Sequence, residues 1–302
     1  MAKAEKLGSS FPWGDIASLR IRSRLVAEGV YAGAHRSARR GAGIEFGGHR
    51  EYVPGDDLRW LDRRALLRHG RHLVRQFETE TDRALRLVVD ASASMGYRGS
   101  RAPETKLGVA SVIAAALARI AVRSGDPIGL AYLGGGSSAR HVAVSGGREA
   151  FDRVLGSLEN AKAEGDAVRD PEMLERSFGM IERAARRGSV VVVLSDLIDL
   201  PRDTAEHFSA MAARGRSVVV AQVLAPDEID LPFDGTVRLR SLEGDVVVET
   251  DTAAARDAYL AALRDLAAHY ETTLMARGAR FLRISTADDP VDSVRAIVGA
   301  VR

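Results

Sequence analysis

Short apolar runs alternate with longer amphipathic stretches from Leu85 to the end of the chain. Five of the runs have the length of a strand, namely Leu85–Val89, Ile128–Leu133, Val190–Leu194, Val218–Leu224 and Arg280–Ile284. The stretches between them carry apolar residues at helical spacing, and we expect helices at about 106–122, 147–158, 171–188, 203–214 and 253–277, with a last helix from residue 290. This alternation is typical of βαβ units. It predicts an α/β fold, Rossmann-like, with a mostly parallel central sheet flanked by helices.

Two segments depart from this rhythm. His141–Val144 follows Ile128–Leu133 after a glycine-rich link and predicts a hairpin rather than a crossover. Residues 226–252 contain two further strand candidates, Val237–Leu242 and Asp245–Val248, around a Glu-Gly turn. We therefore expect a small β-hairpin insertion at about 226–252 within the main domain.

The N-terminal part has a different character. Residues 1–10 are polar and predict disorder, a helix is expected from Asp15 to about Glu28 with Gly29 as its stop, and residues 31–46 predict an extended, turn-rich arm. Residues 1–83 carry 16 Lys/Arg and 11 Asp/Glu. We interpret 1–83 as a basic N-terminal arm that packs on a main domain at 84–302.

Composition narrows the classes of protein. With 46% apolar residues the chain can bury a large core, and its formal net charge is only +2. It contains no cysteine, which excludes disulfides, thiolate nucleophiles and cysteine zinc sites. Its longest uncharged runs are too short to span a bilayer, and the N-terminus lacks an apolar signal region. We expect a cytoplasmic protein.

Oxygen-bearing side chains follow two of the predicted strands. Asp90, Ser92 and Ser94 come at the end of Leu85–Val89, and Ser195-Asp196 follows Val190–Leu194. Ligands of open α/β sheets bind at the carboxyl ends of strands. Carboxylates and hydroxyls suit Mg²⁺, Mn²⁺ or Ca²⁺ rather than zinc. The alternative is an ordinary turn in which the serines cap backbone amides.

These residues carry a resemblance to a known family. Asp90-Ala-Ser-Ala-Ser94 and Ser195-Asp196 resemble the metal-ion-dependent adhesion site of von Willebrand factor type A domains. Residues 43–46, 50–59, 62, 75–80, 227–232 and 270 are similar to the bacterial branch named domain of unknown function 58. The resemblance covers about residues 30–300. It implies a von Willebrand A-like fold, a divalent cation, Mg²⁺ foremost, and a non-enzymatic adaptor that works with a MoxR-type AAA+ ATPase.

Two features qualify this resemblance. The adhesion site usually has a threonine where this chain has Asp166. Asp166 either binds the cation directly, or the site no longer opens for an acidic ligand or holds no cation. The turn that contains Asp56, Asp57, Arg59 and Asp62 either ties the arm to the domain or forms a surface that binds the partner.

Two other functional classes stay open. A metal-dependent phosphoester hydrolase would place further carboxylates near the cation, and Asp166 and Asp199 are the spare candidates. A nucleic-acid-binding arm would use Arg36, Arg39 and Arg40. No phosphate-binding loop, H-E-x-x-H or G-x-S-x-G motif occurs, so we expect no enzyme activity.

Overall fold

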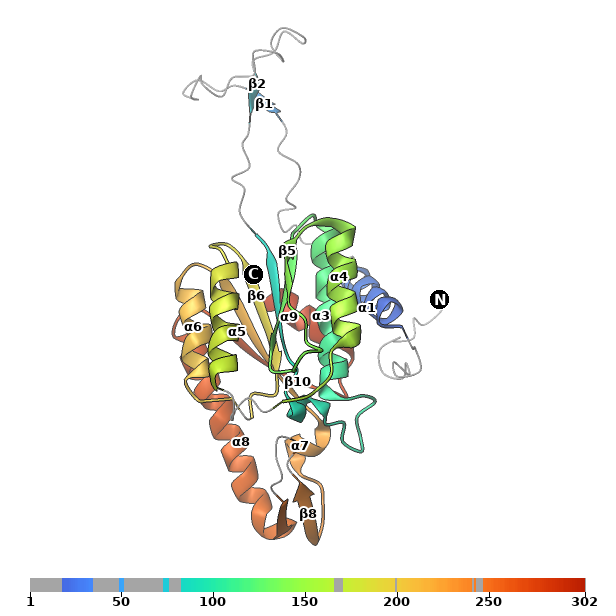
Figure 1. Ribbon diagram of the computed structural model, residues 1–302, viewed down its shortest axis with the longest axis vertical. Coiled ribbons are helices and arrows are strands. Elements are labelled where there is room, and N and C mark those ends of the chain that lie inside the picture. The colour runs from blue at the N-terminus through green and yellow to red at the C-terminus, as the bar shows by residue number, and fades with distance from the viewer. Residues whose placement is uncertain are drawn as a thin grey trace, which may run out of the picture.

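The protein is built around a six-stranded sheet (Figure 1). The computed structural model describes residues 18–34, 49–51, 73–75, 83–165, 171–198, 200–240, 242 and 247–301. In sheet order the strands are β10 (Arg280–Ser285), β7 (Ser217–Leu224), β6 (Val190–Ser195), β3 (Leu85–Asp90), β4 (Ile128–Leu133) and β5 (Val142–Ser145). Five strands are parallel, and β5 pairs antiparallel with β4 as the sequence predicts.

Helices cover both faces of this sheet, which explains why its central strands are apolar on both sides. One face carries α3 (Lys106–Arg123), α4 (Gly147–Asn160) and α9 (Pro290–Ala300). The other carries α5 (Pro171–Ala184), α6 (Thr204–Ala213) and α8 (Thr252–Met275). Alternate residues of β3 enter the two cores, Leu87 on the α3 face and Val88 on the α5 face. The predicted α/β architecture is therefore confirmed.

Helix α1 (Leu19–Ala34) packs outside α3 and α9 (Figure 1). The helix continues through Gly29, so the predicted stop at this residue is wrong. Residues 31–34, predicted as the start of an extended arm, are also helical. A Cβ at Gly29 would lie 2.9 Å from Cγ2 of Val291, so this glycine permits close contact between α1 and α9 instead of ending the helix. Arg295 donates to the carbonyl of Gly29 at 2.7 Å and strengthens the same contact. The division of the chain at residue 83 stays a prediction.

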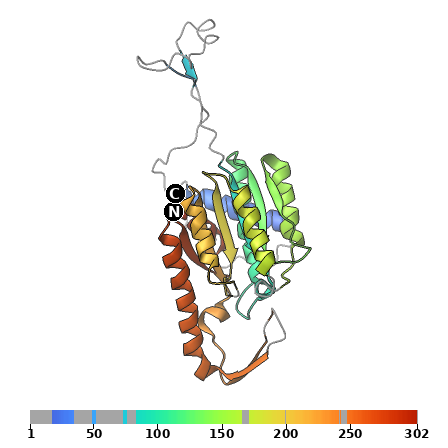
Figure 2. The ribbon, with the colours of Figure 1, turned by 60° about the vertical axis from the view of Figure 1, so that its left-hand side comes forward.

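The segment after β7 forms a short helix and a hairpin. Helix α7 (Pro226–Asp230) was not predicted, and its start is stabilised by Pro226 and by a bond from the Ala225 amide to the Glu228 side chain at 2.8 Å. Strands β8 (Thr236–Arg240) and β9 (Val247–Asp251) then pair antiparallel, which confirms the predicted hairpin with shifted bounds. This hairpin lies beside the start of α8 (Figure 2).

The remaining described strands, β1 (His49–Glu51) and β2 (Leu73–Arg75), pair with each other in an antiparallel manner. Among the residues that the structure describes, none of the helices is long and apolar enough to cross a membrane.

Candidate cation-binding site

The candidate site lies at the carboxyl ends of the central strands, at the lower end of the sheet in Figure 1. Asp90 is the last residue of β3 and Ser195 is the last residue of its neighbour β6. The parallel pairing of these strands brings together two segments that are more than a hundred residues apart in sequence. Asp90 and Asp196 are each only 1% exposed, so the site has a buried floor.

Asp90 is held by neutral donors. Its Oδ1 accepts the amide of Ser92 at 2.9 Å, and its Oδ2 accepts the hydroxyl of Ser195 at 2.5 Å. Burial and the negative charge of Asp196 raise the pKa of Asp90 to about 7, although these hydrogen bonds act in the opposite direction. Within the described part of the chain no basic side chain pairs with Asp90. Where the Asp90 carboxyl is ionised, the described residues therefore give its charge neutral hydrogen-bond donors and no basic partner.

Two serine hydroxyls lie on the turn that follows Asp90. The turn continues into the 3₁₀ helix η4 (Ala93–Gly96), with Ser92 directly before it and Ser94 inside it. The hydroxyl oxygens of Ser92 and Ser94 are 3.1 Å apart, and both residues are buried. Adjacent oxygens around Mg²⁺ are also about 3 Å apart, because each lies about 2.1 Å from the ion. The predicted spacing thus places both hydroxyls together.

A buried lysine that the sequence did not reveal binds Asp196. The Nζ of Lys106 donates to Oδ2 of Asp196 at 2.7 Å and to Oε1 of Glu228 at 2.6 Å. Lys106 is 1% exposed at the start of α3. Burial disfavours its ammonium, but the charges of Asp196 and Glu228 outweigh this effect and raise the pKa of Lys106. Lys106 therefore stays charged and connects β6 to α7.

A signal for Lys106 does exist in the sequence. Helix α3 is apolar on nearly all sides over Leu107–Ala118, so a lysine at its first position has little solvent to reach. Glu228 stands in the first turn of α7, where the sequence suggested only an insertion. Both side chains belong to segments outside the Asp-x-Ser-x-Ser motif, and only the folded chain brings them to Asp196.

Neighbouring loops fix the Asp90 turn through backbone contacts. The amide of Glu164 donates to the carbonyl of Ala91 at 3.0 Å, and the amide of Ala93 donates to the carbonyl of Gly165 at 3.1 Å. Gly134, with φ +71°, leaves no room for a side chain, because a Cβ would lie 2.9 Å from the Ser92 nitrogen. Residues 164 and 165 of the loop before α5 are therefore attached to the Asp90 turn.

The turn after β6 has an unusual backbone. Leu197 is fully buried and has a φ of +63°, a conformation that L-residues with large side chains rarely adopt. Its amide donates to the Ser195 hydroxyl at 3.0 Å, and the amide of Ile198 donates to Oδ1 of Asp196 at 3.2 Å. Strained turns of this kind are common at functional sites, where the surrounding structure holds them in place. Here the turn orients Ser195 and Asp196 at once.

The residues present fit a divalent cation in donor type and in charge. Lys106 supplies one ammonium to Asp196 and Glu228, and the negative charge of Asp196 acts on Asp90. A divalent cation would offset the negative charge that remains among these described residues. Within the described residues, no three His, Cys, Asp or Glu side chains form a metal cluster, so such a cation would need the hydroxyls of Ser92 and Ser94. Both carboxylate oxygens of Asp196 already accept hydrogen bonds: Oδ2 accepts from Lys106, and Oδ1 accepts from the amide of Ile198.

Several predicted site residues lie outside the described residues. These are Asp166, the spare carboxylate Asp199, the arginines of the arm at 36, 39 and 40, and the residues of the acidic turn, Asp56, Asp57, Arg59 and Asp62. Their suggested roles stay predictions. The structure brings Asp90, Ser92, Ser94 and Asp196 together, places Ser195 beside Asp90, and adds Lys106 and Glu228.

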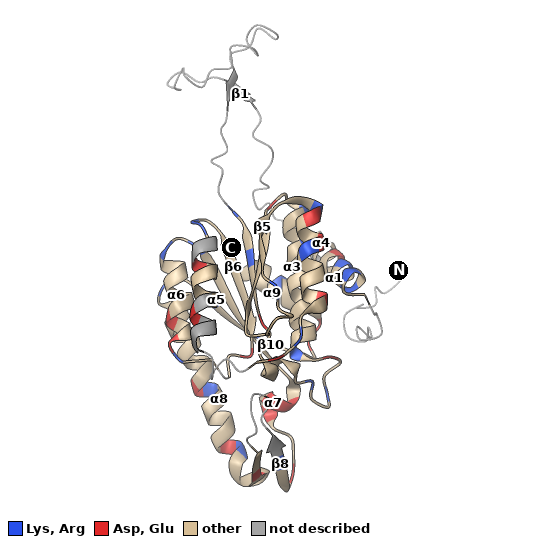
Figure 3. Ribbon diagram, in the orientation of Figure 1, with Lys and Arg blue, Asp and Glu red and all other residues tan. Residues whose placement is uncertain are grey.

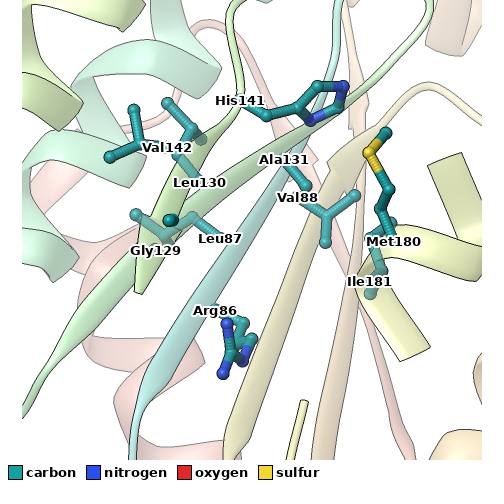
Figure 4. Close-up of a pocket in the computed structure, with 11 residues that line it drawn as sticks. Arg86, Leu87, Val88, Gly129, Leu130, Ala131, His141, Val142, Met180 and Ile181 are labelled. Atoms are coloured by element: carbon teal, nitrogen blue, oxygen red, sulfur yellow. The ribbon is translucent and has the colours of Figure 1, made fainter. Parts of the chain in front are cut away.

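A hollow of about 480 Å³ lies away from the candidate site, between β4 and α5 (Figure 4). Its lining is mostly apolar and includes Leu87, Met180 and His141, whose Nδ1 accepts the Tyr132 amide at 3.2 Å. Burial lowers the pKa of His141, so the ring is neutral at pH 7. This hollow opens on the face of the sheet and not at the strand ends.

The strand order, the two helical layers and the Asp90–Ser94 turn on a central strand define a von Willebrand factor A-like domain. The family described as "Protein of unknown function DUF58" matches residues 48–269, and the chain belongs to this family. The resemblance to the domain of unknown function 58 family is confirmed.

Similar chains come from mycobacteria and from solved bacterial structures. "Uncharacterized protein Rv1480" of Mycobacterium tuberculosis (strain ATCC 25618 / H37Rv) is 29% identical over 275 residues, which are 91% of this chain and 84% of the relative. "Uncharacterized protein Mb1516" of Mycobacterium bovis shows the same values of 29%, 91% and 84%. An "aerotolerance-related membrane protein" from Bacteroides fragilis has a TM-score of 0.49 at 16% identity and covers 72% of this chain and 98% of its own. BatB from Bacteroides thetaiotaomicron has a TM-score of 0.46 at 16% identity, with the same coverage of 72% and 98%.

Proposed function

We propose that the protein is a non-enzymatic adaptor that binds a partner protein at the strand-end site with the help of a divalent cation, Mg²⁺ foremost and Mn²⁺ or Ca²⁺ as substitutes. The observation that carries the proposal is Asp90, a buried carboxylate with a pKa raised to about 7, whose hydrogen-bond donors among the described residues are neutral. A buried charge without a partner is costly, and a cation beside it removes the cost.

The roles of the site residues follow from their contacts. Asp90 and the hydroxyls of Ser92 and Ser94 would hold the cation, and Asp196 would complete the set from β6. Lys106 fixes the Asp196 carboxylate in one orientation and compensates part of its charge. When bound, the cation would supply an open coordination position for an acidic side chain of the partner.

The same contacts argue against hydrolysis by the serine nearest to a carboxylate. Ser195 lies beside Asp90, a pair that resembles a nucleophile with its base. Yet Ser195 is fully buried, and its hydroxyl oxygen also accepts the amide of Leu197. A substrate cannot reach this oxygen without opening the turn. We therefore assign Ser195 a positioning role.

We further propose a MoxR-type AAA+ ATPase as the partner and the cytoplasm as the location. The partner rests on the family of the chain, since the resemblance implies such an ATPase. The positive charge of a bound cation would favour an acidic group on the partner's surface, because a cation with an open coordination position attracts carboxylates.

A pull-down with the full chain tests this function. The immobilised protein is exposed to a lysate of its own organism with 5 to 10 mM Mg²⁺, roughly a saturating range for a moderate site, or with a chelator. We expect a MoxR-type ATPase to be retained with Mg²⁺ and to be lost with the chelator and with the Ser92→Ala/Ser94→Ala variant. Ser124→Ala, a change at an exposed serine at the end of α3, is the matched control. Retention that is identical in all four samples contradicts the role of the cation.

A further inference from the structure

A second charged site lies on the helical layer that includes α1. A hollow of about 350 Å³ opens between α1, α3 and α4. Five arginines contribute to its lining, namely Arg20, Arg24, Arg119, Arg123 and Arg148. The Asp90 site borders the first residue of α3, whereas Arg119 and Arg123 stand in its last turns. About 20 Å of helix separates the two sites, given a rise of 1.5 Å per residue.

Helical spacing directs these side chains to a common place. On α1, Arg20, Arg24 and Glu28 follow one another at intervals of four residues and lie on one face. On α3, Arg119 and Arg123 have the same interval. The packing of α1 on α3 brings the two faces together, and Figure 3 shows basic bands on α1. The arrangement is a consequence of two regular helices in contact.

Positive charge exceeds negative charge in this hollow. Arg24 is paired with Glu28 at 2.8 Å, and Asp152 is shared by Arg20 at 2.8 Å and Arg148 at 4.0 Å. Five arginines thus meet two carboxylates. In the part of the chain that the structure describes, neither Arg119 nor Arg123 has an acidic partner within ion-pair distance. Like charges at an interval of four residues destabilise a helix, so these two cations have a cost that a bound anion would remove.

Aromatic rings hold the guanidinium groups in place. Arg119 lies over the ring of Phe151 with 4.8 Å between its Cζ and the ring centroid, and Arg123 lies over Tyr31 at 4.6 Å. Stacking on a ring uses the face of a guanidinium and leaves its N–H edge for an oxyanion. The Nε of Arg119 is buried and has no hydrogen-bond partner. Burial, together with the charges of Arg20 and Arg24, lowers the pKa of Arg119, which shows the same excess of positive charge.

We propose that this arginine pocket binds a phosphate group of a small ligand. The excess of three positive charges matches an anion with more than one negative charge, and a phosphate monoester carries nearly two at pH 7. Guanidinium groups also bind phosphate through two parallel hydrogen bonds, which requires the fixed orientation that stacking provides. A carboxylate carries one charge and would leave the excess largely unbalanced.

Calorimetric titration tests the pocket with inorganic phosphate and pyrophosphate as probes, at low ionic strength and with acetate as the singly charged control. We expect pyrophosphate to bind more tightly than phosphate, and acetate not to bind detectably. Arg119→Gln/Arg123→Gln should weaken phosphate binding by about tenfold or more, because two charge-assisted contacts are lost. Arg119→Lys keeps the charge but lacks the planar guanidinium group, so its affinity for phosphate should lie between those of the unchanged protein and Arg119→Gln/Arg123→Gln.

A matched control is available on the same layer. Arg153→Gln removes an exposed arginine of α4 that does not line the pocket, and binding should stay within about twofold of the unchanged protein. Vesicles that contain phosphatidic acid identify the source of the phosphate. Co-sedimentation that is lost in Arg119→Gln/Arg123→Gln assigns the phosphate to a lipid headgroup, and its absence assigns the phosphate to a free molecule.

Two results would overturn the proposal. One is phosphate and pyrophosphate binding that is absent in the unchanged protein, or equal in the unchanged protein and in Arg119→Gln/Arg123→Gln. The other is tighter binding of acetate or of a glutamate-rich peptide than of pyrophosphate, which would assign the pocket to carboxylates. Neither result depends on the Asp90 site, because the probes contain no divalent cation.

Discussion

The two ends of α3 carry opposite kinds of charged site. At its first residue, the ammonium of Lys106 binds buried Asp196 and half-buried Glu228, and the charge of Asp196 acts on Asp90. Near its last residue, five arginines meet two carboxylates around an open hollow. The carboxylates of the Asp90 site lie at strand ends and at the start of α7, where they are largely shielded from water. The arginine pocket lies between helices and is open to solvent. An imbalance of charge therefore costs more at the Asp90 site.

This difference orders the effects that substitutions should have. In the buried site the loss of a single charge leaves its partners desolvated and unpaired, which is expensive. In the arginine pocket water and salt screen the arginines, so the loss of a charge changes ligand binding far more than stability.

The largest effect is expected for Lys106→Met. The change leaves Asp196 and Glu228 without their ammonium, and removal of one partner of a buried ion pair costs about 3–5 kcal/mol. Urea denaturation should show this loss in the free energy of unfolding. Lys162→Met, at an exposed position of the loop before α5, should change it by less than about 0.5 kcal/mol. Similar values for the two variants would mean that Lys106 is solvated.

The second effect is a pH dependence at Asp90. Its pKa is about 7 in the folded protein and about 4 in the unfolded chain. The folded state therefore binds the proton more tightly, and stability falls as the pH rises from about 4 to about 7. Asp90→Asn removes this fall. Without divalent cations, we expect the variant to gain on the order of 2–4 kcal/mol relative to the unchanged protein between pH 5 and pH 8.

Thermal unfolding at several pH values measures this difference. Addition of Mg²⁺ at pH 8 should restore stability to the unchanged protein and leave Asp90→Asn unaffected, because ligand binding stabilises only the state that binds. A stability difference between the two proteins that is constant from pH 5 to pH 8 would show that Asp90 does not titrate in this range.

The third effect concerns the close contact between Gly134 and the Asp90 turn. Gly134→Ala places a methyl group 2.9 Å from the Ser92 nitrogen, in a backbone with φ +71°. Gly147→Ala has a similar φ of +80° and nothing within 4 Å, so it measures the conformational cost alone, about 1 kcal/mol. Gly134→Ala should cost roughly 1–3 kcal/mol more, from the displacement of the turn. Equal losses would show that the turn moves freely.

The smallest effect is expected in the arginine pocket. In buffer without phosphate, Arg119→Gln/Arg123→Gln should change the free energy of unfolding by less than about 1 kcal/mol, because the relief of like-charge repulsion and the loss of stacking on Phe151 and Tyr31 oppose each other. In phosphate buffer the unchanged protein should gain stability relative to the variant, since only the unchanged protein binds the ligand. Differential scanning fluorimetry in the two buffers measures this gain, and a stability difference that is the same in both buffers would contradict it.

Sequence patterns predicted the parts of the molecule that depend on local periodicity. The sheet, its parallel order, the β4–β5 hairpin and the shared position of Asp90, Ser92, Ser94 and Asp196 follow from strand length and from where strands end. The prediction at Gly29 was wrong because a glycine can either end a helix or allow another helix to pack closely against it. Only the position of Val291 in the folded chain shows which of the two applies.

Lys106 and Glu228 escaped prediction for a different reason. A lysine at a helix start and an acid in a first turn are both ordinary on a protein surface. Their burial arises because α3 and α7 converge on the end of β6, and this convergence is a property of the whole fold. The arginine pocket likewise needs the packing of α1 on α3, although the four-residue spacing of its arginines is visible in the sequence.

The most direct test of the cation site is calorimetric titration of Mn²⁺ and Mg²⁺ into the unchanged protein, Ser92→Ala/Ser94→Ala and the control Ser124→Ala. The serine variant keeps all three carboxylates and Lys106, so it isolates the two hydroxyls that lie 3.1 Å apart. We predict binding of one cation by the unchanged protein and by Ser124→Ala, with a loss of about tenfold or more in Ser92→Ala/Ser94→Ala. Absence of binding in all three proteins, or equal binding in all three, would contradict a cation site built on Asp90, Ser92 and Ser94.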